Sequence, residues 1–336
     1  MNLKSLSQAI LYFLILIIVF WSKDFFLDAE PYYFIPTTET SFSGYSAISR
    51  YIFITIEGMG LFGYLITMFA TMINALYMSR IIVRFNTNMP KSFISMIVFL
   101  CLVSISFVTK FNFVNHIIIF LLLSSCEKQI FVQLNHRSIK YSFFSAFCLG
   151  MAALLAPVYY LFLIVLIVTH LIASSVTFRE VSASFLGMLT PFLLFSYFQW
   201  LNGNDFLMLY NSTLEFFSES FLEISINLQD YDLYHYIYAF LMLICSVVGI
   251  ITFIKYNNDN STKFEYTYYL FLVNIGLGLL LSILFFSAIP VLFPVFVVGF
   301  ASIISALIVQ TERIFFKLSL IIIFVAFSAL LNFINN

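Results

Sequence analysis

The chain has 336 residues, 62% of them hydrophobic, and its mean hydropathy is +1.03. Charged residues make up only 9%, and 15 Lys and Arg against 16 Asp and Glu leave a net charge of −1. This composition excludes an ordinary soluble domain. The balanced charge also argues against a nucleic-acid partner, which would need a basic surface. We therefore expect one transmembrane domain over residues 1–336, with membrane lipids around it.

Apolar runs long enough to cross a hydrocarbon core of roughly 30 Å recur along the whole chain. They predict an all-α, polytopic helical bundle with about 11 transmembrane helices. The predicted spans are 6–22, 56–79, 92–109, 111–126, 141–156, 158–177, 181–200, 236–254, 266–287, 291–310 and 317–334. Pro157 and Pro290 separate neighbouring runs, because proline lacks an amide donor and clashes with the preceding helical turn.

The distribution of Lys and Arg predicts the orientation, because cytoplasmic loops of membrane proteins are enriched in both. With the N-terminus in the cytoplasm, the inside segments hold Lys4, Arg80, Arg84, Lys91, Lys128, Arg137, Lys140, Arg179, Lys255, Lys263, Arg313 and Lys317. The outside segments then hold Lys23, Arg50 and Lys110. The inverted topology would break the rule almost everywhere, so we predict a cytoplasmic N-terminus.

Two long segments fall on the predicted outer side, at about 23–55 and 201–235. In the second, apolar residues at alternating spacings of three and four predict an amphipathic helix over about 205–227. Such a helix is suited to lying in the membrane interface.

Several motifs favour packing over chemistry. Residues 58–63 read G-x-G-x-x-G, but the strand, helix and acid that a dinucleotide site needs around them are missing. We interpret these glycines as close-packing positions within an apolar helix. His116 and His170 are interpreted as hydrogen-bonded packing residues, and the four cysteines lack metal-ligand spacing. Glu57, near the outer end of the second predicted span, is the carboxylate that lies closest to a membrane run.

A cluster of charges on the outer side is the best candidate site. It combines the acids that follow the first predicted span, Asp24, Asp28 and Glu30, with the outer cations Lys23, Arg50 and Lys110. Basic residues are disfavoured outside, so these three suggest a phosphate or anionic lipid headgroup as ligand. The acids would supply a general base or ligands for a divalent cation. The alternative is that these charges are merely solvated on an acidic face.

The layout resembles the membrane-embedded glycosyltransferases of the GT-C class. The resemblance rests on a first helix, an outer loop with early acids, and a long second helix ending in a basic inner turn. The stretch FCLGMAALLAP at 147–157 is similar to a glycine-led helix that many of these enzymes carry in mid-chain. Together with FRE at 178–180 and GMLTP at 187–191, it resembles more closely a family of uncharacterised polytopic bacterial inner-membrane proteins. This similarity covers roughly residues 80–200.

The resemblance implies transfer of an envelope glycan or lipid-linked sugar at the outer face of a bacterial inner membrane. The donor would be a polyprenyl-phosphate-linked sugar. By position, Asp24 and Asp28 would be the catalytic base or metal ligands, with Lys23, Glu30, Arg50 and Lys110 binding substrate. One alternative is a non-catalytic subunit that assembles an envelope complex with partner proteins. Less favoured are a transporter, since no internal repeat is visible, and an O-antigen polymerase or ligase, since segment 201–235 has no arginine.

Overall fold

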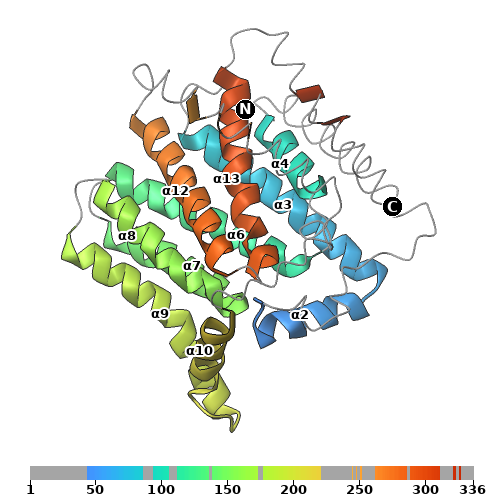
Figure 1. Cartoon of the computed structure of the whole chain (residues 1–336), viewed down its shortest axis with the longest axis vertical. Helices are drawn as coiled ribbons and strands as arrows, with labels where there is room; N and C mark the ends of the chain where they lie inside the picture. The colour runs from blue at the N-terminus through green and yellow to red at the C-terminus, as the bar shows by residue number, and fades with distance from the viewer. Residues whose placement is uncertain are drawn as a thin grey trace.

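The computed structural model describes the chain in ranges. They are 44–85, 94–105, 112–135, 138–172, 177–220, 262–285 and 288–310, with isolated helical residues at 244, 247, 250–251, 321–322 and 325–326. Every regular element in these ranges is a helix (Figure 1), which confirms the predicted all-α class.

The helices follow one another closely in the chain. They are α2 (Ala47–Gly58), α3 (Leu61–Phe85), α4 (Ile94–Ile105), α6 (Phe113–Asn135), α7 (Ile139–Leu155), the 3₁₀-helix η2 (Pro157–Phe162), α8 (Leu163–Ile172), α9 (Phe178–Leu201), α10 (Met208–Ser220), α12 (Thr262–Leu284) and α13 (Ile289–Gln310). Five of them, α3, α6, α9, α12 and α13, are long and apolar enough to cross a membrane. Shorter apolar helices are α4, α7 and the η2–α8 pair. The other predicted spans, 6–22, 236–254 and 317–334, lie outside the described ranges except for single residues.

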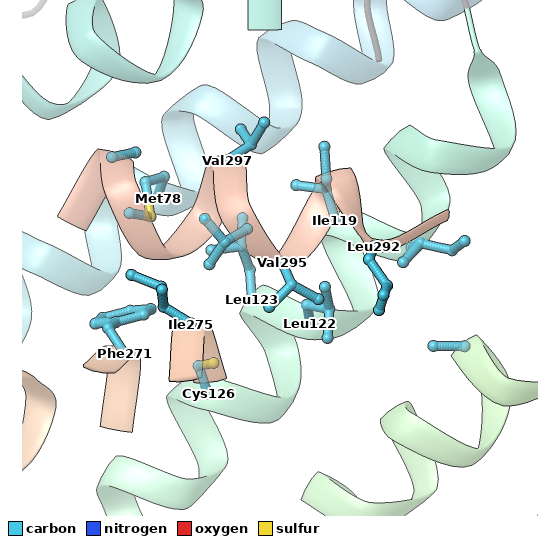
Figure 2. Close-up of a cluster of buried hydrophobic side chains, with 14 of the residues drawn as sticks. Met78, Ile119, Leu122, Leu123, Cys126, Phe271, Ile275, Leu292, Val295 and Val297 are labelled. Carbon is cyan, nitrogen blue, oxygen red and sulfur yellow. The ribbon is translucent and has the colours of Figure 1, made fainter. Parts of the chain in front are cut away.

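Helix α6 lies in the middle of the bundle and contacts α3, α7, α12 and α13 (Figure 1). On the side that faces the other helices its central residues are apolar and almost fully buried, namely Ile118, Ile119, Leu122 and Leu123. Figure 2 shows Ile119, Leu122 and Leu123 packed near Val295 of α13 and Ile275 of α12. This apolar layer forms the core of the described bundle.

Helices α7 and α9 pack against each other through glycine. A Cβ atom on Gly150 would lie 2.6 Å from the Met188 carbonyl oxygen and 3.0 Å from Pro191 Cγ. A Cβ on Gly187 would collide with the Phe143 carbonyl oxygen. Because glycine has no Cβ, the two backbones can approach this closely.

The break between α2 and α3 corrects the interpretation of the glycine motif. The predicted span 56–79 begins not in one helix but across two, because α2 ends at Gly58 and α3 begins at Leu61. Gly60 between them has a φ of 55°, in the left-handed region that glycine adopts without strain. Gly63 does allow close approach, since a Cβ there would collide with the Ile56 carbonyl oxygen.

The two ends of the bundle differ in charge. We call the end that carries α2 and α10 the Tyr45 end (Figure 1), and the opposite end the Arg84 end. Of the Lys and Arg side chains that the structure describes, only Arg50 lies at the Tyr45 end, whereas Arg80, Arg84, Lys128, Lys140 and Arg179 lie toward the Arg84 end. The described part of the chain therefore segregates its cations as the positive-inside prediction requires.

Candidate functional site

Most of the predicted outer-face site lies outside the described residues. This holds for Lys23, Asp24, Asp28, Glu30 and Lys110. Arg50 is described: it lies at the end of the first turn of α2 and is exposed. The structure therefore fixes one member of the predicted site and its surroundings.

Helix α2 is held against the bundle from its first residues. Ser46 caps the helix by accepting a hydrogen bond from the Ser49 amide at 3.3 Å. The Ser46 amide donates to the Leu155 carbonyl at 2.9 Å, and the Ser49 hydroxyl donates to the same oxygen at 2.6 Å. Ser49 and Phe53, one turn apart, are buried, so the face that bears Arg50 and Tyr51 points outward. This one-sided burial is typical of an amphipathic helix.

A buried polar network joins the start of α2 to the start of α6. The Tyr45 hydroxyl donates to Asn115 Oδ1 at 2.9 Å and accepts from Asn112 Nδ2 at 2.9 Å. Asn112 Oδ1 in turn accepts from the Asn115 amide at 3.2 Å, and Asn115 Nδ2 reaches the Pro290 carbonyl at 3.5 Å. Burial raises the pKa of Tyr45, although its hydrogen bonds with both asparagines lower it in part. The phenol therefore stays protonated and can donate.

A second polar cluster lies at the Arg84 end, between α3 and α6. The Glu127 side chain is only 6% exposed and forms ion pairs with Arg84 at 3.1 Å and with Lys128 at 3.5 Å. The Tyr77 hydroxyl donates to Glu127 Oε2 at 2.8 Å. The Arg84 guanidinium lies 4.5 Å from the centre of the Phe131 ring, within cation–π distance.

Sequence reasoning missed this cluster. The fourth predicted span ends at Cys126, but α6 continues to Asn135 and carries Glu127 inside the bundle. Glu127, rather than Glu57, is thus a carboxylate buried within a candidate span. The sequence did offer one signal. Glu127 follows the fourth predicted span and Arg84 follows the second, so both fall on the predicted inner side, where an acid and a base could pair.

A third polar group lies between α3 and α6, nearer the Tyr45 end. His116 Nε2 lies 3.1 Å from Thr71 Oγ1, and Asn74 Nδ2 donates to the His116 carbonyl at 2.9 Å. This agrees with the interpretation of His116 as a hydrogen-bonded packing residue. Both Asn74 and His116 lie along an open groove of about 340 Å³ whose other walls are apolar.

The described residues contain no group of three His, Cys, Asp or Glu side chains that could hold a metal ion. The acids for which a divalent cation is predicted, Asp24 and Asp28, lie outside those residues. The network around Tyr45 holds α2, with Arg50 on its outward face, beside the first turn of α6. No protein-family model matches the chain, and comparisons with curated proteins and with solved structures find no match either.

Proposed function

We propose that the protein transfers a sugar from a polyprenyl-phosphate donor to an envelope acceptor, at the Tyr45 end of the bundle and on the outer face of a bacterial inner membrane. The observation that supports this most directly is the hydrogen bond between Tyr45 and Asn112. Tyr45 precedes Arg50 by five residues, and Asn112 follows Lys110 by two. Two residues of extended chain span at most roughly 7 Å, so the bond favours a shared site for both cations.

In the proposed reaction the acceptor hydroxyl loses its proton to Asp24 or Asp28, directly or with a divalent cation bound by these acids. The acceptor oxygen then attacks the anomeric carbon, and the bond from that carbon to the phosphate oxygen breaks. Polyprenyl phosphate leaves with an additional negative charge. Arg50 and Lys110 would bind the donor, together with Lys23 and Glu30, which flank the two acids in the chain. The two cations would stabilise the developing charge.

Two further features support this proposal, and the second of them favours it over transport. The cations at the Arg84 end favour a cytoplasmic location for that end, which leaves the Tyr45 end outside. In addition, the apolar layer of Ile119, Leu122 and Leu123 (Figure 2) lies in the chain between the buried polar residues Asn115 and His116 near the start of α6 and Glu127 nearer its end. A carrier for polar solutes places its binding site near mid-membrane depth, where this helix is apolar.

The test is a transfer assay in membrane vesicles that contain the protein, with a radiolabelled polyprenyl-linked sugar pool as donor. The double variant Asp24→Asn, Asp28→Asn should lose at least about 100-fold in rate, since general base catalysis contributes that much or more. Asp205→Asn is the matched control, because Asp205 is an exposed acid at the same end of the bundle. Its rate should equal that of the wild type.

Retained transfer by the double variant would exclude these acids as the base. No transfer above empty vesicles by the wild type, together with a stoichiometric envelope protein in its purified complex, would instead favour the non-catalytic assembly subunit.

A further inference from the structure

Exposed cations from three helices gather at the Arg84 end of the bundle. The side chains of Arg84 and Lys128 are 46% and 32% exposed, and both form ion pairs with the buried Glu127. One carboxylate thus faces two cations, so these three groups together carry a net positive charge. Arg80 is exposed one turn before Arg84 on α3, and no ion pair is seen for it among the described residues. Lys140 is exposed in the first turn of α7.

The ring of Phe131 links these cations across the helices. Arg84 Cζ lies 4.5 Å and Lys128 Nζ 5.8 Å from the centre of that ring. The Tyr141 ring stacks on Phe131 with the two centroids 5.2 Å apart, which brings the first turn of α7, with Lys140, beside them. Because these contacts already order Arg84 and Lys128, binding an anion there immobilises fewer freely rotating side chains.

The side of α3 that bears the two arginines continues into the open groove between α3 and α6. Arg80 and Arg84 follow Ile73 by seven and eleven residues, spacings that return to the same side of a helix. Ile73 and Phe69 line the groove from α3, and Phe120 lines it from α6. At 1.5 Å per residue, Arg80 lies about 16 Å from Phe69 along the helix axis. Half of the hydrocarbon core is roughly 15 Å thick, so the groove lies at the depth that an acyl chain would reach from a headgroup at Arg80.

We propose that these cations bind the phosphate of an anionic phospholipid, with one acyl chain lying in the groove between α3 and α6. Arg80 and Arg84 donate hydrogen bonds to the phosphate oxygens, since a guanidinium matches the geometry of a phosphate. Lys128 and Lys140 add positive charge beside it. A zwitterionic headgroup carries its own cation and is therefore attracted less. Basic groups between membrane helices are typical sites for anionic headgroups. This site lies at the end opposite to the proposed sugar-transfer site and does not depend on it.

The experiment uses the full-length protein in phosphatidylcholine nanodiscs with a trace of a photoreactive lipid. One probe is phosphatidylglycerol with a diazirine in mid-chain, and the other is phosphatidylcholine with the same acyl chains. After irradiation, labelled peptides are located by mass spectrometry. The phosphatidylglycerol probe should label residues 61–84 and 113–133 at least about 5-fold more than the phosphatidylcholine probe, the factor that attraction by one cation gives.

Matched variants locate the preference. Arg80→Gln should lower the labelling ratio about 5-fold, and Arg80→Lys, which keeps the charge, should retain most of it. Arg179→Gln is the control and should leave the ratio unchanged. Arg179 is an exposed cation at the same end, but it lies on α9, which packs against α7 rather than α3. If Arg80→Gln fails to fold, Lys140→Gln provides the same test from another helix.

The exposed residues Leu193 and Leu194 of α9 provide an internal control within each sample, since both probes should label them equally. Equal labelling of α3 and α6 by the two probes would overturn the proposal. Equal losses in Arg80→Gln and Arg179→Gln would also overturn it, because they would show a general attraction of anionic lipid to the basic end rather than a site.

Discussion

Arg84 Nη1 lies 3.1 Å from Glu127 Oε1, and this ion pair joins the last turns of α3 to α6 at the basic end of the bundle. The two residues are 43 positions apart in the chain. Glu127 is almost fully buried, while 46% of the Arg84 side chain is exposed. The charge of the buried Glu127 carboxylate is therefore stabilised by its partners, whereas the Arg84 guanidinium remains partly exposed.

We predict that Glu127→Gln and Arg84→Gln each destabilise the protein and that their effects are not additive. Exposed ion pairs contribute about 0.2–1 kcal/mol, and breaking a buried pair costs about 3–5 kcal/mol. Because one partner is buried and the other half-exposed, a double-mutant cycle should give a coupling energy of about 1–2 kcal/mol. The free energy of unfolding would be measured by SDS titration in mixed micelles.

Arg80→Gln is the control for that cycle. Arg80 is an exposed cation one turn before Arg84 on the same helix, and no ion pair with Glu127 is seen for it among the described residues. It should show no coupling to Glu127→Gln. Equal coupling at both arginines would mean that the effect comes from net charge rather than from the observed contact.

Tyr45→Phe should destabilise the protein by about 1–3 kcal/mol, because it leaves the buried amides of Asn112 and Asn115 without their shared hydroxyl. Tyr51→Phe on α2 is the control: Tyr51 is 73% exposed, and its substitution should change stability by less than about 0.5 kcal/mol. Similar effects of both substitutions would mean that the network contributes no stability.

The pH dependence of the same comparison has a definite sign. Burial raises the pKa of Tyr45 above its ordinary value of 10.0 in the folded protein. The stability difference between the wild type and Tyr45→Phe should therefore be constant below about pH 10 and decrease above it, as the unfolded chain loses its phenol proton first. SDS titrations at several pH values would measure this difference.

Hydropathy predicted the helical class and the position of most described spans, because long apolar runs have few other stable forms in a bilayer. The end of α6 was placed nine residues too early, at Cys126 instead of Asn135. Glu127 and Lys128 look like the end of a span when only local sequence is considered. What keeps them in the helix is Arg84 and Tyr77 on α3, partners that no local pattern identifies.

The candidate site was predictable only in part, for a similar reason. Arg50 could be found because charge is rare in this chain. Tyr45, Asn112 and Asn115 could not be found, since uncharged polar residues at the ends of apolar runs are common in ordinary connections. Asn74 is a single amide in an apolar run, and only the structure places it beside an open groove between α3 and α6.

Two stretches of the chain that were singled out in the sequence, at 147–157 and 187–191, lie in contact with each other. The stretch at 147–157 contains Gly150, and its hypothetical Cβ points at Met188 and Pro191 of the stretch at 187–191. Gly150→Ala should therefore destabilise the protein by about 1–3 kcal/mol, the cost of overpacking a close interface. Thermal unfolding in detergent would measure this effect.

Gly276→Ala is the matched control, because a Cβ at Gly276 in α12 would meet nothing within 4 Å. Alanine there should leave stability unchanged or raise it by up to about 1 kcal/mol. If Gly150→Ala were equally harmless, the contact between α7 and α9 would be looser than observed.

The orientation of the bundle can be tested with single cysteines in a variant whose four native cysteines are replaced by alanine. Ser218 on α10 is exposed at the Tyr45 end, and Lys140 on α7 is exposed at the Arg84 end. A membrane-impermeant maleimide added to intact bacterial spheroplasts should label Ser218→Cys and not Lys140→Cys. After lysis it should label both. The reverse pattern would place the Tyr45 end in the cytoplasm and exclude sugar transfer at the outer face, since Arg50 is fixed to that end through Ser46, Ser49 and Leu155.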